Sequence, residues 1–205
     1  MLTRFFSTLI IVVLLTLAQP GALPPAAAQG PETVTITNRT DDQPLVGLYY
    51  AAPEPDSPAV LLMHHGGGRK EAWIDLIPLL QEAGYATLTV DLRGHGETGG
   101  SFNGDLAQED AHLWIEWLRA QPDIDPDHVS IVGASLGADV GLQVMAGDEQ
   151  IVTLAALSVT LDIEGMNSKD AVEQIGPRPL FLAAALGVEN EADTCLLYTS
   201  PSPRD

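Results

Sequence analysis

The sequence contains very little cysteine and few basic residues. Its 205 residues include one cysteine, Cys195, and nine Lys and Arg against 28 Asp and Glu, which gives a formal net charge of −19. A single cysteine excludes a disulfide scaffold and a cysteine-bound metal. The negative charge repels nucleic acid and anionic membranes, so we expect neither as a partner of the mature protein. Nothing in the composition predicts the oligomeric state.

Residues 1–28 have the pattern of a secretory signal peptide. Arg4 supplies the initial charge, an apolar run over residues 5–17 follows, and three small residues end at Ala28. The apolar run is short for a membrane span, so we expect cleavage after Ala28, with an uncleaved anchor as the alternative. The mature protein is therefore expected to be secreted or periplasmic.

The last residues, 195–205, have a sequence of a different kind. The string CLLYTSPSPRD matches the translation of a transposase-type sequencing adapter, and the alternative is an ordinary polar tail rich in Pro and Ser. We exclude this segment from the predicted fold and assign the domain to residues 29–194. That domain then has no cysteine, which also excludes a thiol nucleophile.

Alternating side chains predict an antiparallel hairpin at the start of the domain. Residues 33–37 alternate polar and apolar side chains, and residues 45–51 form a second run of this kind. The sequence Asp-Asp-Gln-Pro over residues 41–44 is typical of a turn between them.

From Ala59 onward, short apolar strands alternate with helical patterns. Strands are predicted over residues 59–63, 85–90, 129–132, 151–159 and 180–185, and helices from Trp73 to Gly84, from near Asp105 to Pro122, and after Gly137. In the second helix, Gln108 is predicted to form a capping box with Asp105. Alternation of this kind predicts an α/β fold in which a mostly parallel sheet carries helices on both faces.

Ser135 lies in the sequence Gly-Ala-Ser-Leu-Gly, residues 133–137, between a predicted strand and a predicted helix. A nucleophile elbow places its serine on a sharp turn at this kind of junction, and glycines keep the flanking positions free of bulk. The alternative is a tight turn with an incidental serine. The context favours Ser135 as a catalytic nucleophile.

A second motif, His-His-Gly-Gly-Gly over residues 64–68, follows the predicted strand at residues 59–63. Acyl transfer requires N–H donors for the oxyanion of the tetrahedral intermediate, and a glycine loop offers its amides for this purpose. We expect the oxyanion hole to use the amides of Leu136 and Gly66, with His65 as the alternative to Gly66. A phosphate-binding glycine loop is disfavoured because no Gly-Lys-Ser/Thr follows.

Four motifs in this order resemble the α/β-hydrolase superfamily, in the branch of small esterases, dienelactone hydrolases and serine aminopeptidases. They are the His-Gly loop, Asp-Leu-Arg-Gly-His-Gly at residues 91–96, the helix ending in Trp117-Leu118 and the elbow at Ser135. The resemblance covers residues 45–194 and implies no metal and no cofactor. It also implies that His95 orders a loop. His112 and His128 are expected to be ordinary solvated or packed histidines.

The triad order in this fold is serine, then an acid, then histidine. The acid is expected after the strand at residues 180–185, where Glu189, Glu191 and Asp193 are candidates and Asp193 fits the family pattern best. The alternative is that all three are surface carboxylates. No histidine follows Ser135 in the sequence. We therefore expect the last strand and helix of the fold to be missing and this chain to be nearly inactive.

Together these observations predict a serine hydrolase of carboxylic esters or related acyl compounds, acting on a small-molecule substrate through an acyl-enzyme. One alternative is an exported peptidase of the serine-aminopeptidase type. Another is a non-catalytic binding protein on the same scaffold.

Overall fold

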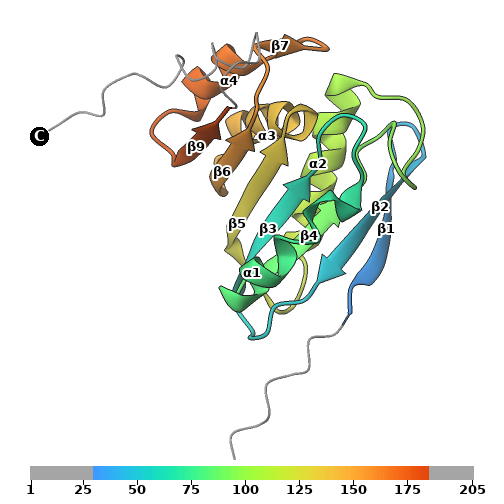
Figure 1. The fold of residues 1–205 in the computed structure, drawn as a ribbon, viewed down its shortest axis with the longest axis vertical. Coiled ribbons are helices and arrows are strands. Elements are labelled where there is room, and N and C mark those ends of the chain that lie inside the picture. The colour runs from blue at the N-terminus through green and yellow to red at the C-terminus, as the bar shows by residue number, and fades with distance from the viewer. Residues whose placement is uncertain (1–29, 185–205) are drawn as a thin grey trace, which may run out of the picture.

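The computed structural model describes residues 30–184, so the predicted signal peptide and the segment 195–205 lie outside the described residues. A seven-stranded sheet forms the centre of this region (Figure 1). In spatial order, its strands are β1 (Glu32–Asn38), β2 (Gln43–Tyr50), β4 (Ala86–Val90), β3 (Ser57–Met63), β5 (Ile124–Ala134), β6 (Ile151–Leu157) and β9 (Leu180–Ala183).

The first two strands form the predicted antiparallel hairpin. β1 pairs with β2 from Glu32 opposite Tyr49 to Asn38 opposite Gln43, and β2 pairs antiparallel with β4. The pairs from β4 through β3, β5 and β6 to β9 are all parallel. The mostly parallel sheet with an N-terminal antiparallel hairpin is thus confirmed.

Helices cover both faces of the sheet, as the sequence predicted (Figure 1). Leu61 and Met63 of β3 belong to the main core, which also includes buried residues of α2 (Gly104–Arg119), α3 (Leu136–Gly147) and α4 (Ser168–Ile175). Val60 and Leu62, which point to the other face, pack in a smaller core with Ile77 of α1 (Ile77–Glu82). No helix within residues 30–184 is long and apolar enough to cross a membrane.

The first predicted helix is divided into two short pieces. The structure has a 3₁₀ helix, η1 (Lys70–Trp73), and then α1, with Pro78 in the first turn of α1. Proline has no N–H for a bond to the preceding turn, and its fixed φ suits a helix start, so the longer helix was a wrong prediction. Gly84, with φ of +88°, follows the end of α1.

The start of the second helix also differs from the prediction. The N-cap of α2 is Asn103, whose side chain accepts a hydrogen bond from the Leu106 amide at 2.9 Å. Asp105 lies inside the first turn, and Gln108 donates to the carbonyl of Gly104 instead of forming a capping box. Asn103 is the N-cap in place of Asp105 because Asn103 has the extended backbone that the N-cap position needs.

We expect Asn103→Ala to lower the free energy of unfolding by about 1 kcal/mol, because one amide of the first turn loses its acceptor. Asp105→Ala is the matched control and should change it by less than about 0.5 kcal/mol, since Asp105 is exposed and caps nothing. Urea unfolding of both variants measures the difference. Equal losses would contradict Asn103 as the cap.

The segment between β6 and β9 contains structure that the sequence did not predict. A small antiparallel hairpin, β7 (Asp162–Ile163) and β8 (Met166–Asn167), leads directly into α4. Asn167 caps α4 by accepting a hydrogen bond from the Asp170 amide at 3.0 Å. This segment returns the chain from the end of β6 to the parallel strand β9.

Candidate active site

Ser135 occupies the sharp turn between β5 and α3. Its φ of 48° and ψ of −116° are rarely adopted by a residue with a side chain. The turn is held by backbone hydrogen bonds: the Ser135 amide donates to the carbonyl of Leu157 at the end of β6 at 2.7 Å, and the Ser135 carbonyl accepts from the amides of Ala138 and Asp139. The strained conformation at Ser135 is what a nucleophile elbow requires.

Both glycines of the Gly-x-Ser-x-Gly motif are required by close backbone contacts. A Cβ on Gly133 would lie 2.4 Å from the carbonyl oxygen of Gly137. A Cβ on Gly137 would lie 2.4 Å from the carbonyl oxygen of Met63 and 2.7 Å from that of His64. The elbow is therefore packed backbone to backbone, both on itself and on the chain that enters the His-Gly loop.

This contact brings the two expected oxyanion donors to the same end of neighbouring strands. Met63, the last residue of β3, pairs with Gly133 of β5, so the loop after β3 and the turn after β5 start side by side. Leu136 is the first residue of α3, where an amide has no partner within the helix. Gly66 is exposed, and a Cβ there would have open space around it.

His64 is fully buried and fixed by hydrogen bonds from both ring nitrogens. Its Nε2 accepts from the amide of Leu92 at 3.1 Å, and its Nδ1 lies 2.7 Å from the carbonyl of His65. This pattern requires a neutral ring with the proton on Nδ1. Burial lowers the pKa of His64 below its ordinary value. Both nitrogens are occupied, so His64 supports the loop and is unsuited to act as a base.

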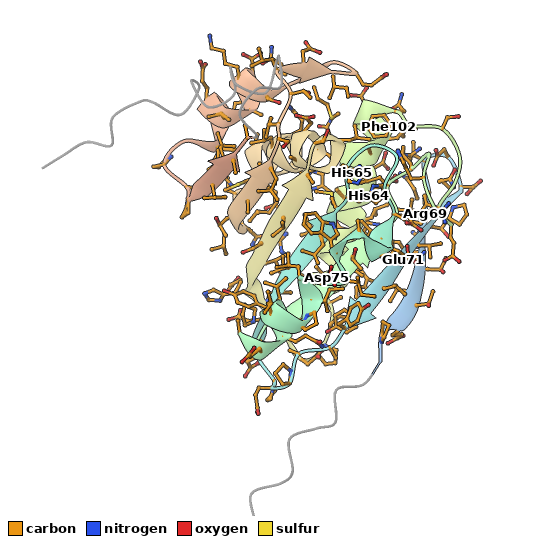
Figure 2. All side chains as sticks on the ribbon, viewed as in Figure 1. His64, His65, Arg69, Glu71, Asp75 and Phe102 are labelled. Atoms are coloured by element: carbon orange, nitrogen blue, oxygen red, sulfur yellow. The ribbon has the colours of Figure 1, made fainter. Side chains whose placement is uncertain are left out.

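The other end of the His-Gly loop is fixed by a buried ion pair. Asp91, immediately after β4, accepts from the amide and from Nζ of Lys70 at 2.8 and 2.9 Å. Burial would raise the pKa of Asp91, but the hydrogen bonds from Lys70 and from the Glu97 amide lower it below its ordinary value. The loop, on which Figure 2 labels His64, His65 and Arg69, is thus tied at both ends to the residues that follow β4.

The Arg-Gly-His-Gly segment is ordered by a second buried pair. Arg93 donates to both carboxylate oxygens of Asp110 at 2.7 Å and to Asp41 at 2.9 Å. His95 packs edge-on against His64 with ring centroids 5.1 Å apart, and its Nδ1 lies 3.1 Å from the carbonyl of Arg93. These contacts suit the expected role of His95 in ordering the loop.

The remaining predicted residues are distributed as follows. Glu189, Glu191 and Asp193, the candidate acids, lie outside the described residues. His112 is half-buried on α2, and His128 is exposed with its Nδ1 2.6 Å from Asp125. Within residues 30–184, no group of three or more His, Cys, Asp or Glu is arranged to hold a metal ion.

One buried carboxylate close to Ser135 was not predicted. Asp139, in the first turn of α3, is inaccessible to solvent, and burial raises its pKa to about 6. Its only signal in the sequence is a charged residue within an otherwise apolar stretch after the motif.

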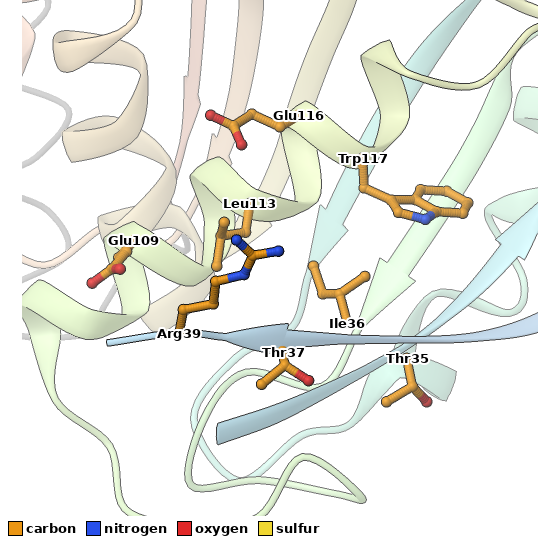
Figure 3. Close-up of a pocket in the computed structure, with 8 residues that line it drawn as sticks. All are labelled: Thr35, Ile36, Thr37, Arg39, Glu109, Leu113, Glu116 and Trp117. Atoms are coloured by element: carbon orange, nitrogen blue, oxygen red, sulfur yellow. The ribbon is translucent and has the colours of Figure 1, made fainter. Parts of the chain in front are cut away.

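The structure also has a groove of about 700 Å³ that contains none of the predicted site residues (Figure 3). It lies between β1 and α2, with Ile36, Leu113 and Trp117 among its apolar residues and Arg39, Glu109 and Glu116 among its charged ones. The site at Ser135 is instead formed where β3 and β5 end.

Two solved hydrolases have a fold similar to that of this chain. The Pyrococcus furiosus esterase Pf2001 has a TM-score of 0.63 at 22% identity, over 74% of this chain and 69% of that one. The 2,6-dihydroxy-pseudo-oxynicotine hydrolase has a TM-score of 0.66 at 18% identity, over 74% of this chain and 52% of that one. At these identities the likeness shows a shared fold.

Curated relatives match the sequence over much of its length. An uncharacterised protein of Mycobacterium tuberculosis is 32% identical over 124 residues, which cover 60% of this chain and 44% of the relative. The Salmonella typhimurium protein YfhR is 26% identical over 182 residues, which cover 84% of this chain and 61% of YfhR. The chain thus spans less than two thirds of the length of either relative.

A family model described as the alpha/beta hydrolase fold matches residues 58–180, more than half of the sequence. The match begins just inside β3 and ends at the start of β9, so it includes the His-Gly loop and the turn at Ser135. The strand order, the helices on both faces and the elbow agree with it. The chain therefore belongs to the α/β-hydrolase fold family.

Proposed function

We propose that the full-length protein is an exported serine hydrolase of small carboxylic esters or related acyl compounds. In this proposal the Ser135 hydroxyl attacks the acyl carbonyl, and a histidine base takes its proton. The protonated histidine gives this proton to the leaving alcohol, and water, activated by the same base, then hydrolyses the acyl-enzyme and restores the Ser135 hydroxyl. The acid of the triad is Asp193.

The amides of Leu136 and Gly66 are the proposed donors to the oxyanion. Two features support them: the backbone contact between Gly137 and the carbonyls of Met63 and His64, and the fixation of the His-Gly loop at both of its ends. Donors that are already in place cost no reorganisation when the negative charge develops on the substrate oxygen. The pair needs no metal.

The observation that carries the proposal is the backbone of Ser135, with φ of 48° in a turn that tolerates no side chain at either flanking glycine. A residue held in such a conformation costs on the order of 1–3 kcal/mol, so it is retained where it serves a purpose. In this proposal the purpose is to present the Ser135 hydroxyl to the substrate at the end of β5, near the amides of Leu136 and Gly66.

The proposal is tested by assaying the full-length protein with p-nitrophenyl acetate and with amino-acid p-nitroanilides. We expect ester hydrolysis to exceed anilide hydrolysis by at least about 100-fold in kcat/KM, because an alcohol-type leaving group needs less assistance than an amine. His128→Ala serves as the control and should leave the ester rate unchanged, since His128 is exposed and its partner among residues 30–184 is Asp125. Comparable or higher anilide activity would indicate a peptidase instead.

A further inference from the structure

Asp139 is a buried carboxylate that the proposed reaction does not use. It lies one helical turn after Ser135, and its side chain forms no ion pair with a described residue. Instead it accepts three hydrogen bonds. Oδ1 accepts from the Thr160 amide at 3.0 Å and from the Ser168 hydroxyl at 3.1 Å, and Oδ2 accepts from the Thr160 hydroxyl at 2.9 Å.

Both partners of Asp139 lie at the base of the β7–β8 hairpin. Thr160 precedes β7, and Ser168 follows β8 as the first residue of α4. The amide of Ser168 donates to the carbonyl of Leu161 at 3.1 Å, which closes the base of the hairpin. One carboxylate therefore fastens both sides of the hairpin to α3, and a second bond from Gln143 of α3 to the carbonyl of Asn167 lies beside it.

The hairpin lies at the carboxyl ends of the parallel strands, where Ser135 also lies. It starts after β6, whose last residue, Leu157, accepts the hydrogen bond from the Ser135 amide. Its tip reaches the start of α2, where the carbonyl of Glu164 lies 2.9 Å from the position that a Cβ on Gly104 would take. Figure 1 shows β7 at the end of the molecule toward which β3 and β5 point.

We propose that Asp139 is a positioning residue for the active site, which fixes the β7–β8 hairpin against the nucleophile helix so that the hairpin forms a rigid wall of the acyl-binding cleft. The assignment of the wall to an acyl cleft rests on the proposed function. The fixation itself rests only on the three hydrogen bonds that Asp139 accepts from Thr160 and Ser168, which lie on either side of the hairpin. A carboxylate suits this position because it accepts several bonds at once.

The charge state of Asp139 gives a readout that is independent of catalysis. Burial raises its pKa to about 6, while the hydrogen bonds from Thr160 and Ser168 lower it, and no charged side chain among residues 30–184 contributes to the shift. Because the folded pKa lies above the ordinary value of 3.8, the stability that the protonated form provides is complete below that value and is lost as the pH rises through about 6. We expect the melting temperature of the wild type to fall relative to that of Asp139→Asn over this pH range. Parallel melting curves would contradict a titrating carboxylate.

Hydrogen exchange followed by mass spectrometry tests the fixation in the chain itself. Asp139→Ala should speed amide exchange in residues 160–168 at least tenfold while exchange in β5 stays unchanged, because Thr160 and Ser168 lose their acceptor. Asp139→Asn has the same shape, keeps one oxygen that can accept from the Thr160 amide and the Ser168 hydroxyl, and can donate its NH2 to the Thr160 hydroxyl, so it should restore most of the protection. Asp162→Asn, an exposed charge change on the hairpin, is the matched control and should have no effect. Unchanged exchange in Asp139→Ala would overturn the proposal.

Kinetics of the full-length protein test the role of the wall. Asp139→Ala should raise KM for long-chain esters at least tenfold with kcat within about threefold of the wild type, and Asp139→Asn should recover the lower KM. Equal losses in kcat for short and long esters would overturn the role in the cleft. If the wild type hydrolyses no ester, the proposed function fails, and the exchange experiment still decides whether Asp139 fixes the hairpin.

Discussion

Replacing Ser135 with alanine is expected to lower kcat of the full-length protein for p-nitrophenyl esters by on the order of 10⁴ to 10⁶-fold, with KM changed little. The reason is that every covalent step passes through the Ser135 hydroxyl, whereas substrate binding depends on the walls of the cleft and on the amides. Alanine is no larger than serine and places the same Cβ in this backbone turn, so the fold should be retained. Steady-state kinetics and circular dichroism measure the two effects separately.

Ser130→Ala provides the matched control for this variant. Ser130 lies within β5, half-buried and away from the turn, so its loss should leave kcat within about twofold of the wild type. A folded Ser135→Ala protein that retained more than about one hundredth of the wild-type kcat would contradict Ser135 as the nucleophile.

Gly137→Ala is expected to lower the free energy of unfolding by about 3 kcal/mol or more. The added Cβ would lie 2.4 Å from the Met63 carbonyl oxygen and 2.7 Å from that of His64, and both are backbone atoms that cannot turn aside. Relief of the clash requires α3 to move away from β3, which also separates the proposed oxyanion donors. Urea unfolding measures the loss.

Gly141→Ala, in the same helix, is the control that separates this clash from the general effect of alanine. Its Cβ would meet side-chain methyl groups and no backbone atom: Leu154 at 3.1 Å, Ile131 at 3.3 Å and Met63 at 3.4 Å. Alanine also favours the helical state over glycine by about 0.5–1 kcal/mol, so the net change should stay within about 1 kcal/mol. Similar losses at both positions would contradict the backbone contact at Gly137.

Local sequence patterns were sufficient to predict the central sheet and the turn at Ser135. The apolar run over residues 59–63 becomes β3 with both faces buried, and the alternation over residues 33–37 becomes β1 in the expected hairpin. The elbow could be predicted because a buried strand, small flanking residues and a helix start all lie within a few residues of Ser135. Such requirements leave a direct signature in the sequence. The close approach of Gly137 to the carbonyls of Met63 and His64 was not predicted, because these residues are distant in the sequence.

Features that depend on contacts between distant residues were not predicted. The partners of Asp139, Thr160 and Ser168, are 21 and 29 residues away along the chain, and no local pattern connects them. The fixation of the His-Gly loop by Asp91 was not predicted for the same reason, because it joins residues that are 21 positions apart.

The N-cap of α2 was misassigned for a different reason. Asn103 and Asp105 are both good capping residues by type, and the backbone conformation at Asn103 decides between them. The sequence alone contains no information on that conformation.

The most direct test of the account is to treat the full-length protein with a fluorophosphonate probe and to locate the modified residue by peptide mass spectrometry. The account predicts one phosphonylated serine, Ser135, with labelling abolished in Ser135→Ala and by heat denaturation. An unlabelled native protein, or labelling at another serine, would contradict the assignment of Ser135 as an activated nucleophile.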